Sequence, residues 1–241
     1  MTLAAPLVAP LTHLTELATA EACLAADLAG RDAEWSGLPS GLPSWSRAQL
    51  VGHLAGSARG LINLCDWAAT GVETPMYPSP EVRAAQIAER AGLPWPDLVA
   101  EVSAAQAALA TRLEALTEPV ATRSLRLASG AAVTPTDIAA LRIREIEIHR
   151  VDLAAEYQPV DWSHVFTLRT FSQLTPFFLE HRDVGAQVLR SVDSGSCWTV
   201  GVAGPDLWGT EADLLAWLIG RPHGPLRTSD GAALPDSPVW V

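Results

Sequence analysis

The spacing of apolar residues predicts that most of the first 158 residues are helical. Leu14, Leu17, Leu24 and Leu28 recur at helical intervals in a helix expected over 12–29, which Gly30 would end. The same pattern predicts four further helices, over residues 47–69, 80–91, 95–117 and 134–157. A short strand or connection is expected at 123–133, before the last of these helices. Three prolines exclude the segment GVETPMYPSP, residues 71–80, from any helix.

The pattern changes at Pro159, within YQPVDW. Beyond it we expect a helix over 163–181, two short strands joined by a Ser-Gly turn in AQVLRSVDSGSCWTVGVAG, and a helix over 210–220. The prediction is therefore an α+β protein with two domains. Residues 1–158 would form a four-helix bundle and residues 159–241 a small α/β domain.

Composition and charge narrow the classes of partner and compartment. The net charge is -11 and all 16 basic residues are arginine, so a nucleic-acid backbone would meet a repulsive surface. The three cysteines form no CxxC pair, which favours a reducing compartment. No basic segment precedes the apolar MTLAAPLVAP, and no apolar run approaches the ~18 residues that cross a bilayer. We expect a cytoplasmic protein without membrane or nucleic-acid partners.

Polar side chains interrupt the apolar face of the helix expected over 134–157. Glu145 and His149 are four residues apart and share this face with Asp152, one turn further along. His53 lies on the same face as Leu50, Leu54 and Ser57 in the helix over 47–69, and so points inward as well. Three ligands from two helices would hold a divalent metal and leave a position open, as catalytic zinc sites do.

A second interpretation of these residues needs no metal. Glu145 could pair with Arg142 or Arg144, and His149 could be a hydrogen-bonded core histidine, which would remove the cost of burying an unpaired charge. Spacing alone leaves both interpretations open.

Two segments resemble a known family. WSRAQLVGHL, residues 45–54, is similar to the W-[ST]-x-x-x-L-x-x-H signature of DinB/YfiT-like bundle metalloproteins, and RIREIEIHRVDL, residues 142–153, resembles the R-E-x-x-I-H-x-x-D-L stretch of the mycothiol-dependent maleylpyruvate isomerase family. The loop ETPMYPSPE and the ending GR…PVW also resemble that family.

The resemblance implies zinc on His53, Glu145 and His149, with Arg221 as a catalytic residue that reaches from a C-terminal domain similar to sterol-carrier modules. It also implies isomerisation of maleylpyruvate to fumarylpyruvate through addition and elimination of a low-molecular-weight thiol, mycothiol or bacillithiol. Arg221 would hold a substrate carboxylate, although its place after Gly220 is equally typical of a surface arginine at a helix end.

Two alternative functions stay open. One is a thiol S-transferase that uses the same metal site on electrophiles, and the other is a non-enzymatic ligand-binding protein. The remaining candidate side chains are interpreted as having no catalytic role: Cys65 and Cys197 as core residues, His13, His164 and His181 as structural residues, and His223 as a solvent-exposed loop residue. Trp45 and Trp67 are expected to line the mouth of the site.

Overall fold

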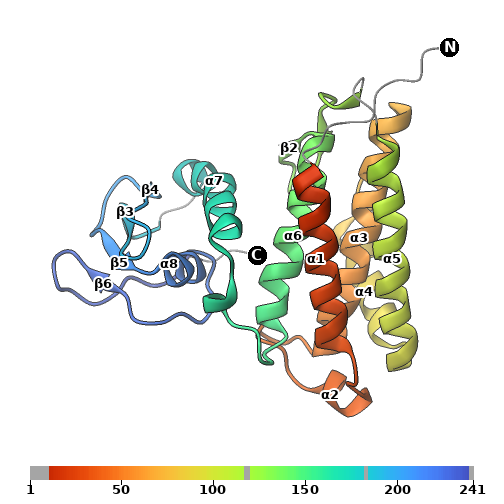
Figure 1. Ribbon diagram of the computed structural model, residues 1–241, viewed down its shortest axis with the longest axis horizontal. Helices are drawn as coiled ribbons and strands as arrows, with labels where there is room; N and C mark the ends of the chain where they lie inside the picture. Colours follow the sequence, from red (N-terminus) through yellow and green to blue (C-terminus); the bar gives the residue numbers. More distant parts are fainter. Residues whose placement is uncertain (1–10, 117–119, 182–183, 239–241) are drawn as a thin grey trace. The chain divides into compact units, whose positions relative to one another are not determined.

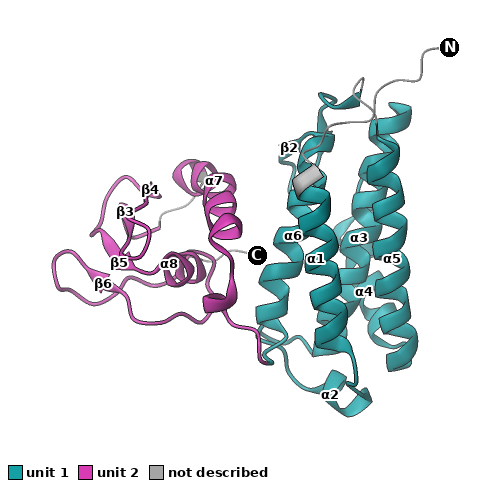
Figure 2. Cartoon of the chain, viewed as in Figure 1, with its two compact units in different colours: residues 1–155 teal, residues 156–241 magenta. Residues whose placement is uncertain are grey.

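The computed structural model divides into two compact units, Met1–Ala155 and Glu156–Val241 (Figure 2). It describes residues 11–116, 120–181 and 184–238. The expected boundary falls just after this division, between residues 158 and 159. Among the described residues, no helix is both long and apolar enough to cross a membrane. The molecule is rich in helix and carries small sheets, so the α+β fold class is confirmed.

The first unit is built on four long helices, labelled α1, α3, α5 and α6 in Figure 1. Shorter elements connect them: α2, α4, a hairpin of β1 and β2, and the 3-10 turn η2. Their bounds in chain order are α1 Leu11–Leu28, α2 Ala33–Gly37, α3 Arg47–Thr70, α4 Pro80–Ala91, α5 Trp95–Ala115, β1 Leu125–Arg126, β2 Ala132–Val133, η2 Pro135–Asp137 and α6 Ile138–Asp152. The helices predicted from the sequence all occur, whereas α2 was not predicted.

Helix α3 lies at the centre of the bundle and packs against α4, α5 and α6. It begins at the predicted capping box, in which Ser46 and Gln49 exchange side-chain-to-backbone hydrogen bonds. Gly52, Gly56 and Gly60 follow at intervals of four residues. A Cβ at Gly52 would stand 3.2 Å from the Cβ of Arg90 in α4. These glycines therefore let α4 and the loop before it approach the α3 backbone closely.

Helix α6 ends at Asp152, five residues before the predicted end at 157. The chain turns at Ala154, whose φ of 52° is left-handed and cannot continue a helix. Arg47, in the first turn of α3, donates to the carbonyl oxygens of Leu153 at 2.7 Å and Ala154 at 2.8 Å. Because no glycine or proline marks this turn, and its stabilising contact comes from another helix, the sequence pattern could not show where α6 stops.

The second unit combines two helices with a four-stranded sheet of order β4-β3-β5-β6. Strands β3 and β5 are parallel, and the other two pairings are antiparallel. The bounds are η3 Pro159–Asp161, α7 His164–His181, β3 Val188–Ser191, β4 Cys197–Thr199, β5 Leu207–Gly209, α8 Glu211–Leu218 and β6 Arg227–Thr228. Strands β5 and β6, of three and two residues, were not predicted because they are too short to show an alternating pattern.

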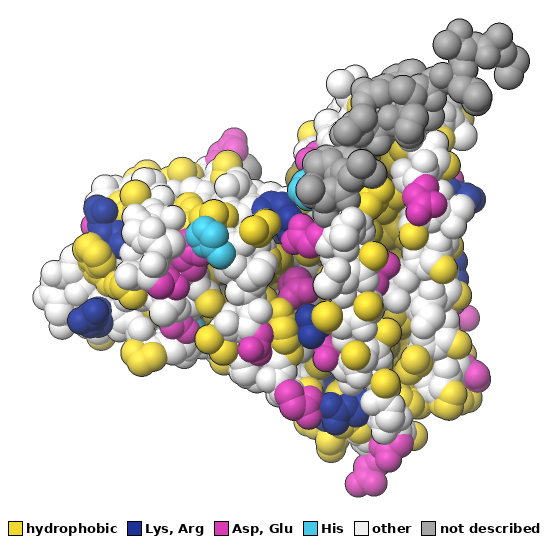
Figure 3. All heavy atoms as spheres, in the orientation of Figure 1, with side chains coloured by type: hydrophobic (Ala, Val, Ile, Leu, Met, Phe, Trp, Pro, Cys, Tyr) yellow, Lys and Arg dark blue, Asp and Glu magenta, His cyan; other side chains and the backbone are white. Residues whose placement is uncertain are grey.

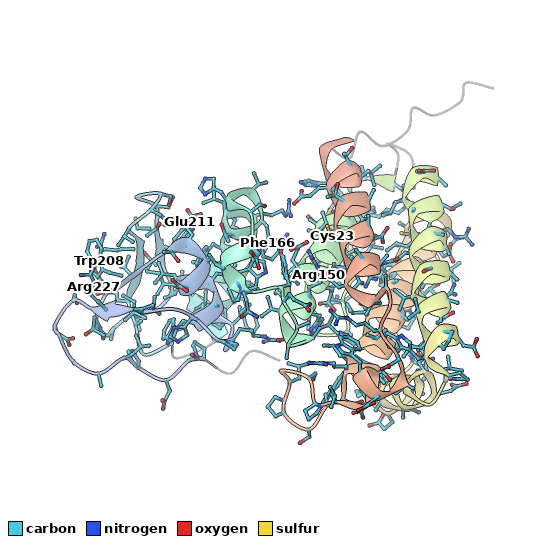
Figure 4. All side chains as sticks on the ribbon, turned by 60° about the horizontal axis from the view of Figure 1, so that its bottom comes forward. Cys23, Arg150, Phe166, Trp208, Glu211 and Arg227 are labelled. Carbon is cyan, nitrogen blue, oxygen red and sulfur yellow. The ribbon has the colours of Figure 1, made fainter. Side chains whose placement is uncertain are left out.

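Aromatic side chains form much of the core of this unit. Trp217 of α8 is fully buried and donates its indole N–H to the carbonyl of Pro235 at 3.1 Å. Phe171 of α7 stacks on Trp198 of β4, with ring centroids 3.8 Å apart. In the side-chain view of Figure 4, the buried Phe166 belongs to α7 and Glu211 to the start of α8. The two helices and the sheet thus share one apolar core.

On the molecular face in Figure 3, acidic, basic and apolar side chains are interspersed over both units. On this face the charged side chains are therefore not concentrated on one element.

Candidate metal site

Three side chains predicted as metal ligands converge inside the first unit. His53 comes from α3, and Glu145 and His149 come from adjacent turns of α6. The Nε2 atoms of the two histidines are 3.2 Å apart, and Glu145 Oε2 lies 3.2 Å from His53 Nε2 and 3.9 Å from His149 Nε2. Within the described chain this is the one group of three or more such side chains whose ligand atoms all lie within 4.8 Å of one another.

These separations suit a tetrahedral zinc ion. With Zn–N bonds of about 2.0–2.1 Å, two ligand atoms of a tetrahedral site lie roughly 3.3 Å apart. The observed spacing of 3.2 to 3.9 Å spans this value. Two imidazole nitrogens and a carboxylate oxygen are also a donor set that zinc accepts. The residues present therefore fit a divalent metal.

Asp152 fixes the orientation of the His149 ring. Its Oδ2 atom lies 2.8 Å from His149 Nδ1, and its side chain is buried. A carboxylate at Nδ1 holds a proton there and leaves the Nε2 lone pair directed at the other two ligands. Asp152 is itself held, because its carbonyl oxygen accepts from the backbone N–H of Gly41 at 2.7 Å. Figure 1 shows the α6 helix that carries this pair.

Burial and neighbouring charges shift the protonation equilibria of the site in opposite directions. Burial lowers the pKa of His53, an effect that the hydrogen bond with Glu145 only partly offsets. Burial alone would raise the pKa of Glu145, but the hydrogen bond with His53 and the nearby positive charges outweigh it and hold this pKa well below its usual range. Both shifts favour a neutral imidazole beside an ionised carboxylate, which are the protonation states that bind a metal.

An aromatic ring contacts the site, and the same side chain lines a surface recess. The ring of Trp45 meets the His53 ring edge-on, with centroids 6.0 Å apart. Trp45 also lines a recess of about 590 Å³ formed by residues 37 and 39–46 together with Gln49. The contact with His53 places Trp45 beside the site, and its role at the mouth of the site stays a prediction. The corresponding prediction for Trp67 stays a prediction.

A further arginine, which sequence reasoning missed, contacts the site from α4. Arg83 Nη2 lies 3.3 Å from His53 Nδ1, and the guanidinium lies over the ring of Tyr77, 5.7 Å from its centroid. Burial raises the pKa of Tyr77, so its phenol keeps its proton. The glycines of α3, which bring α4 close, were the available signal for this contact.

The alternative pairing of Glu145 with Arg142 does not describe the structure. Arg142 is fully buried and directs Nη1 to the carbonyl oxygen of Leu54 at 2.8 Å. Glu145 instead directs Oε2 at the two histidines. Arg144 contributes a nearby positive charge that lowers the pKa of Glu145.

The structure also places the arginine and the two cysteines that the sequence analysis considered. Arg221 is buried rather than at the surface, and its Nη1 donates to the carbonyl oxygen of Ile219 at 2.7 Å. Cys65 is a core residue, and burial raises the pKa of its thiol to about 12, so it is not a nucleophile at neutral pH. Cys197 is exposed on β4, and the prediction that it fills the core is wrong because its side chain faces away from the sheet's packed side.

The structure describes the side chains of three of the other histidines, His13, His164 and His223. His164 pairs with Glu211 at 2.6 Å, a partner that no spacing indicated because 47 residues separate the two. His223 is exposed, as predicted. The side chain of His181 lies outside the described residues, whereas Nδ1 of His13 is buried without a hydrogen-bond partner.

Comparison with known proteins places the chain in a family. Residues 15–154, more than half of the chain, match the family model of the mycothiol maleylpyruvate isomerase N-terminal domain. The chain belongs to this family. A solved structure described as the mycothiol-dependent maleylpyruvate isomerase is 28% identical, with a TM-score of 0.89 over 95% of this chain and 96% of that one. A mutant form of that isomerase gives a TM-score of 0.88 at the same identity and coverage. No curated protein sequence matches the chain.

Proposed function

We propose that this protein is a metal- and mycothiol-dependent isomerase that converts maleylpyruvate to fumarylpyruvate. The observation that carries the proposal is the convergence of His53, Glu145 and His149 in a member of a mycothiol-dependent family. His53 Nε2, His149 Nε2 and a carboxylate oxygen of Glu145 would hold zinc, with a coordination position left for the thiol. A bound zinc ion lowers the pKa of a thiol and so supplies a thiolate at neutral pH.

The reaction needs only addition and elimination at one carbon-carbon double bond. The thiolate sulfur adds to the double bond, which is conjugated with the ketone, and the electron pair moves onto the ketone oxygen. The former double bond is then single and rotates. The electron pair returns, the carbon-sulfur bond breaks and the thiolate leaves the trans product. Atoms and charge balance without any oxidant or reductant.

The chain's own residues would orient the metal ligands and bind the substrate. Asp152 keeps His149 in the tautomer that presents Nε2. Arg221 is proposed to bind a substrate carboxylate, because a guanidinium offers paired donors to one carboxylate. Its burial in the second unit supports a role other than that of a surface charge.

The proposal is tested by turnover with purified components. Zinc-loaded protein should convert maleylpyruvate to fumarylpyruvate with mycothiol and show no conversion without a thiol. Bacillithiol in place of mycothiol tests the choice of thiol. If the protein instead consumes mycothiol and forms stable conjugates with an electrophile such as a haloalkane, but leaves maleylpyruvate unchanged, it is an S-transferase and the proposal is wrong.

The role of Arg221 is tested against Arg227, an exposed arginine of the same unit. Arg221→Gln should raise the KM for maleylpyruvate about 10- to 100-fold, the loss expected for a charge-assisted hydrogen bond to a carboxylate. Arg227→Gln should leave it unchanged. Equal KM values in the two variants would remove Arg221 from the site.

A further inference from the structure

Arg83 is a positively charged side chain placed directly against a proposed metal ligand. Helix α4 carries it, and its Nη2 atom lies 3.3 Å from Nδ1 of His53. Its other interaction is with Tyr77, whose ring lies beneath the guanidinium. Both contacts lie within the first unit, so the placement does not depend on the second one.

In the part of the chain that the structure describes, no carboxylate pairs with Arg83. Other arginines of the same unit have such partners: Arg59 bonds to Glu101 through two nitrogens, and Arg112 lies 2.8 Å from Asp66. Among the described residues, Arg83 has no carboxylate within ion-pair distance. A partly buried guanidinium that faces only an imidazole and a phenol lacks an anionic partner.

Metal binding at the triad of His53, Glu145 and His149 would prevent the His53 imidazole from accepting a hydrogen bond from Arg83. The ligand atom of His53 is Nε2, because this is the nitrogen that faces Glu145 and His149. An imidazole that gives its Nε2 lone pair to a metal carries its hydrogen on Nδ1. Nδ1 and Arg83 Nη2 would then both be donors, so the guanidinium must turn to another acceptor.

We propose that Arg83 is a specificity-determining residue that binds one carboxylate of a dicarboxylate substrate when the triad holds a metal. This inference rests on the proposed function, whose substrate carries two carboxylates. Arg83 lies beside a metal ligand, and Tyr77 supports its guanidinium from below, which limits the ways in which it can turn. Arg83 would supply a positive charge to one carboxylate of the substrate, since Arg221 is proposed to bind only the other.

The test measures binding of maleate, the plain cis dicarboxylate, to zinc-loaded protein by titration calorimetry. Arg83→Gln should weaken maleate binding about 10- to 100-fold, as expected for loss of a charge-assisted hydrogen bond, and Arg83→Lys should recover part of it. Arg112→Gln is the matched control, because it removes the same charge from an exposed ion pair of the same unit and should leave binding unchanged. Zinc content, measured by elemental analysis, should be the same in all four proteins.

Kinetics give a second readout. In Arg83→Gln, the KM for maleylpyruvate should rise with the KM for mycothiol unchanged. Unchanged maleate binding in Arg83→Gln, or a wild-type protein that does not bind maleate, would overturn the inference. So would loss of zinc from Arg83→Gln, since Arg83 would then support His53. Wild-type protein that binds maleate through Arg83 but does not isomerise maleylpyruvate would refute the proposed function and leave this inference standing.

Discussion

Each unit of the molecule contains a glutamate beside a histidine, and the two clusters differ in what completes them. In the second unit, Glu211 is buried and both of its oxygens accept hydrogen bonds, from His164 and Thr167 at Oε2 and from Ser194 at Oε1. In the first unit, Glu145 faces two imidazoles.

The difference lies in the donors. Hydroxyl groups bring their own hydrogen and can satisfy a carboxylate without help. Two histidine Nε2 atoms 3.2 Å apart cannot both be satisfied by one carboxylate. A cation bound by both nitrogens and the carboxylate would satisfy all three groups. The Glu211 cluster is thus complete as it stands, whereas the Glu145 cluster is arranged for an ion. Four predictions test this contrast, beginning with the largest expected effect.

Replacing one histidine in each cluster should give the largest difference between the two clusters in zinc binding and turnover. His53→Ala should abolish zinc retention after dialysis and lower isomerase turnover at least about 10³-fold, because metal-assisted charge stabilisation is worth several kcal/mol. His164→Ala should retain zinc and most of the turnover. Elemental analysis and a maleylpyruvate assay check both variants. Equal zinc content in the two variants would show that the Glu145 cluster is not a metal site.

The sequence could predict this contrast only in part. Glu145 and His149 are four residues apart on one helix, so their shared face follows from helical periodicity. His53 required the further step that its helix turns the same kind of face inward. The pairing of His164 with Glu211 joins the starts of α7 and α8, and no periodicity reports such a contact.

The contact of Arg83 with His53 in the first unit could not be predicted from the sequence either. Its helix was predicted with the correct bounds, but its contact with His53 depends on how closely α4 packs against α3. The glycines of α3 permit that approach without specifying it. Short strands and the left-handed turn at Ala154 escaped prediction because tertiary contacts, rather than local preference, fix them.

The second prediction tests the role of Asp152, whose carboxylate contacts His149 Nδ1. Asp152→Asn keeps the shape of the side chain but removes the charge that holds the proton on His149 Nδ1. Zinc affinity should fall about 10- to 100-fold, the usual effect of losing such a partner. Competition with a fluorescent zinc chelator measures it. Asp66→Asn, in the exposed pair with Arg112, is the control and should bind zinc like the wild type.

The third prediction tests whether the Glu211 cluster is purely structural. Glu211→Ala removes the buried carboxylate that accepts hydrogen bonds from the hydroxyls of Thr167 and Ser194. The free energy of unfolding should fall by about 1–3 kcal/mol, the usual contribution of hydrogen bonds to a charged group. Urea denaturation measures this loss, and Asp236→Ala, an exposed acid of the same unit, should show none. A drop in zinc content in Glu211→Ala would show that the Glu211 cluster is not purely structural.

The fourth prediction concerns the metal-free protein and pH. The pKa of His53 is lower in the folded chain than its usual value of about 6.5, mainly because of burial. At a pH between the folded and the unfolded pKa of His53, this side chain is protonated in the unfolded chain and neutral in the folded one. The free energy of unfolding therefore falls as the pH drops below about 6.5. One such proton changes it by at most about 1.4 kcal/mol per pH unit. The lowered pKa of Glu145 acts in the same direction, but only at more acidic pH.

Thermal denaturation of metal-free protein between pH 7 and pH 5 should therefore show a falling Tm, and His53→Ala should show a shallower fall. Saturating zinc should raise the Tm at pH 7, because a ligand that binds only the folded state stabilises it by mass action. That zinc-dependent rise should shrink toward pH 5, since protons compete for the same imidazole nitrogens. Identical pH slopes for wild type and His53→Ala would mean that the buried imidazole carries no such penalty, and the argument that this cluster is arranged for an ion would lose its energetic basis.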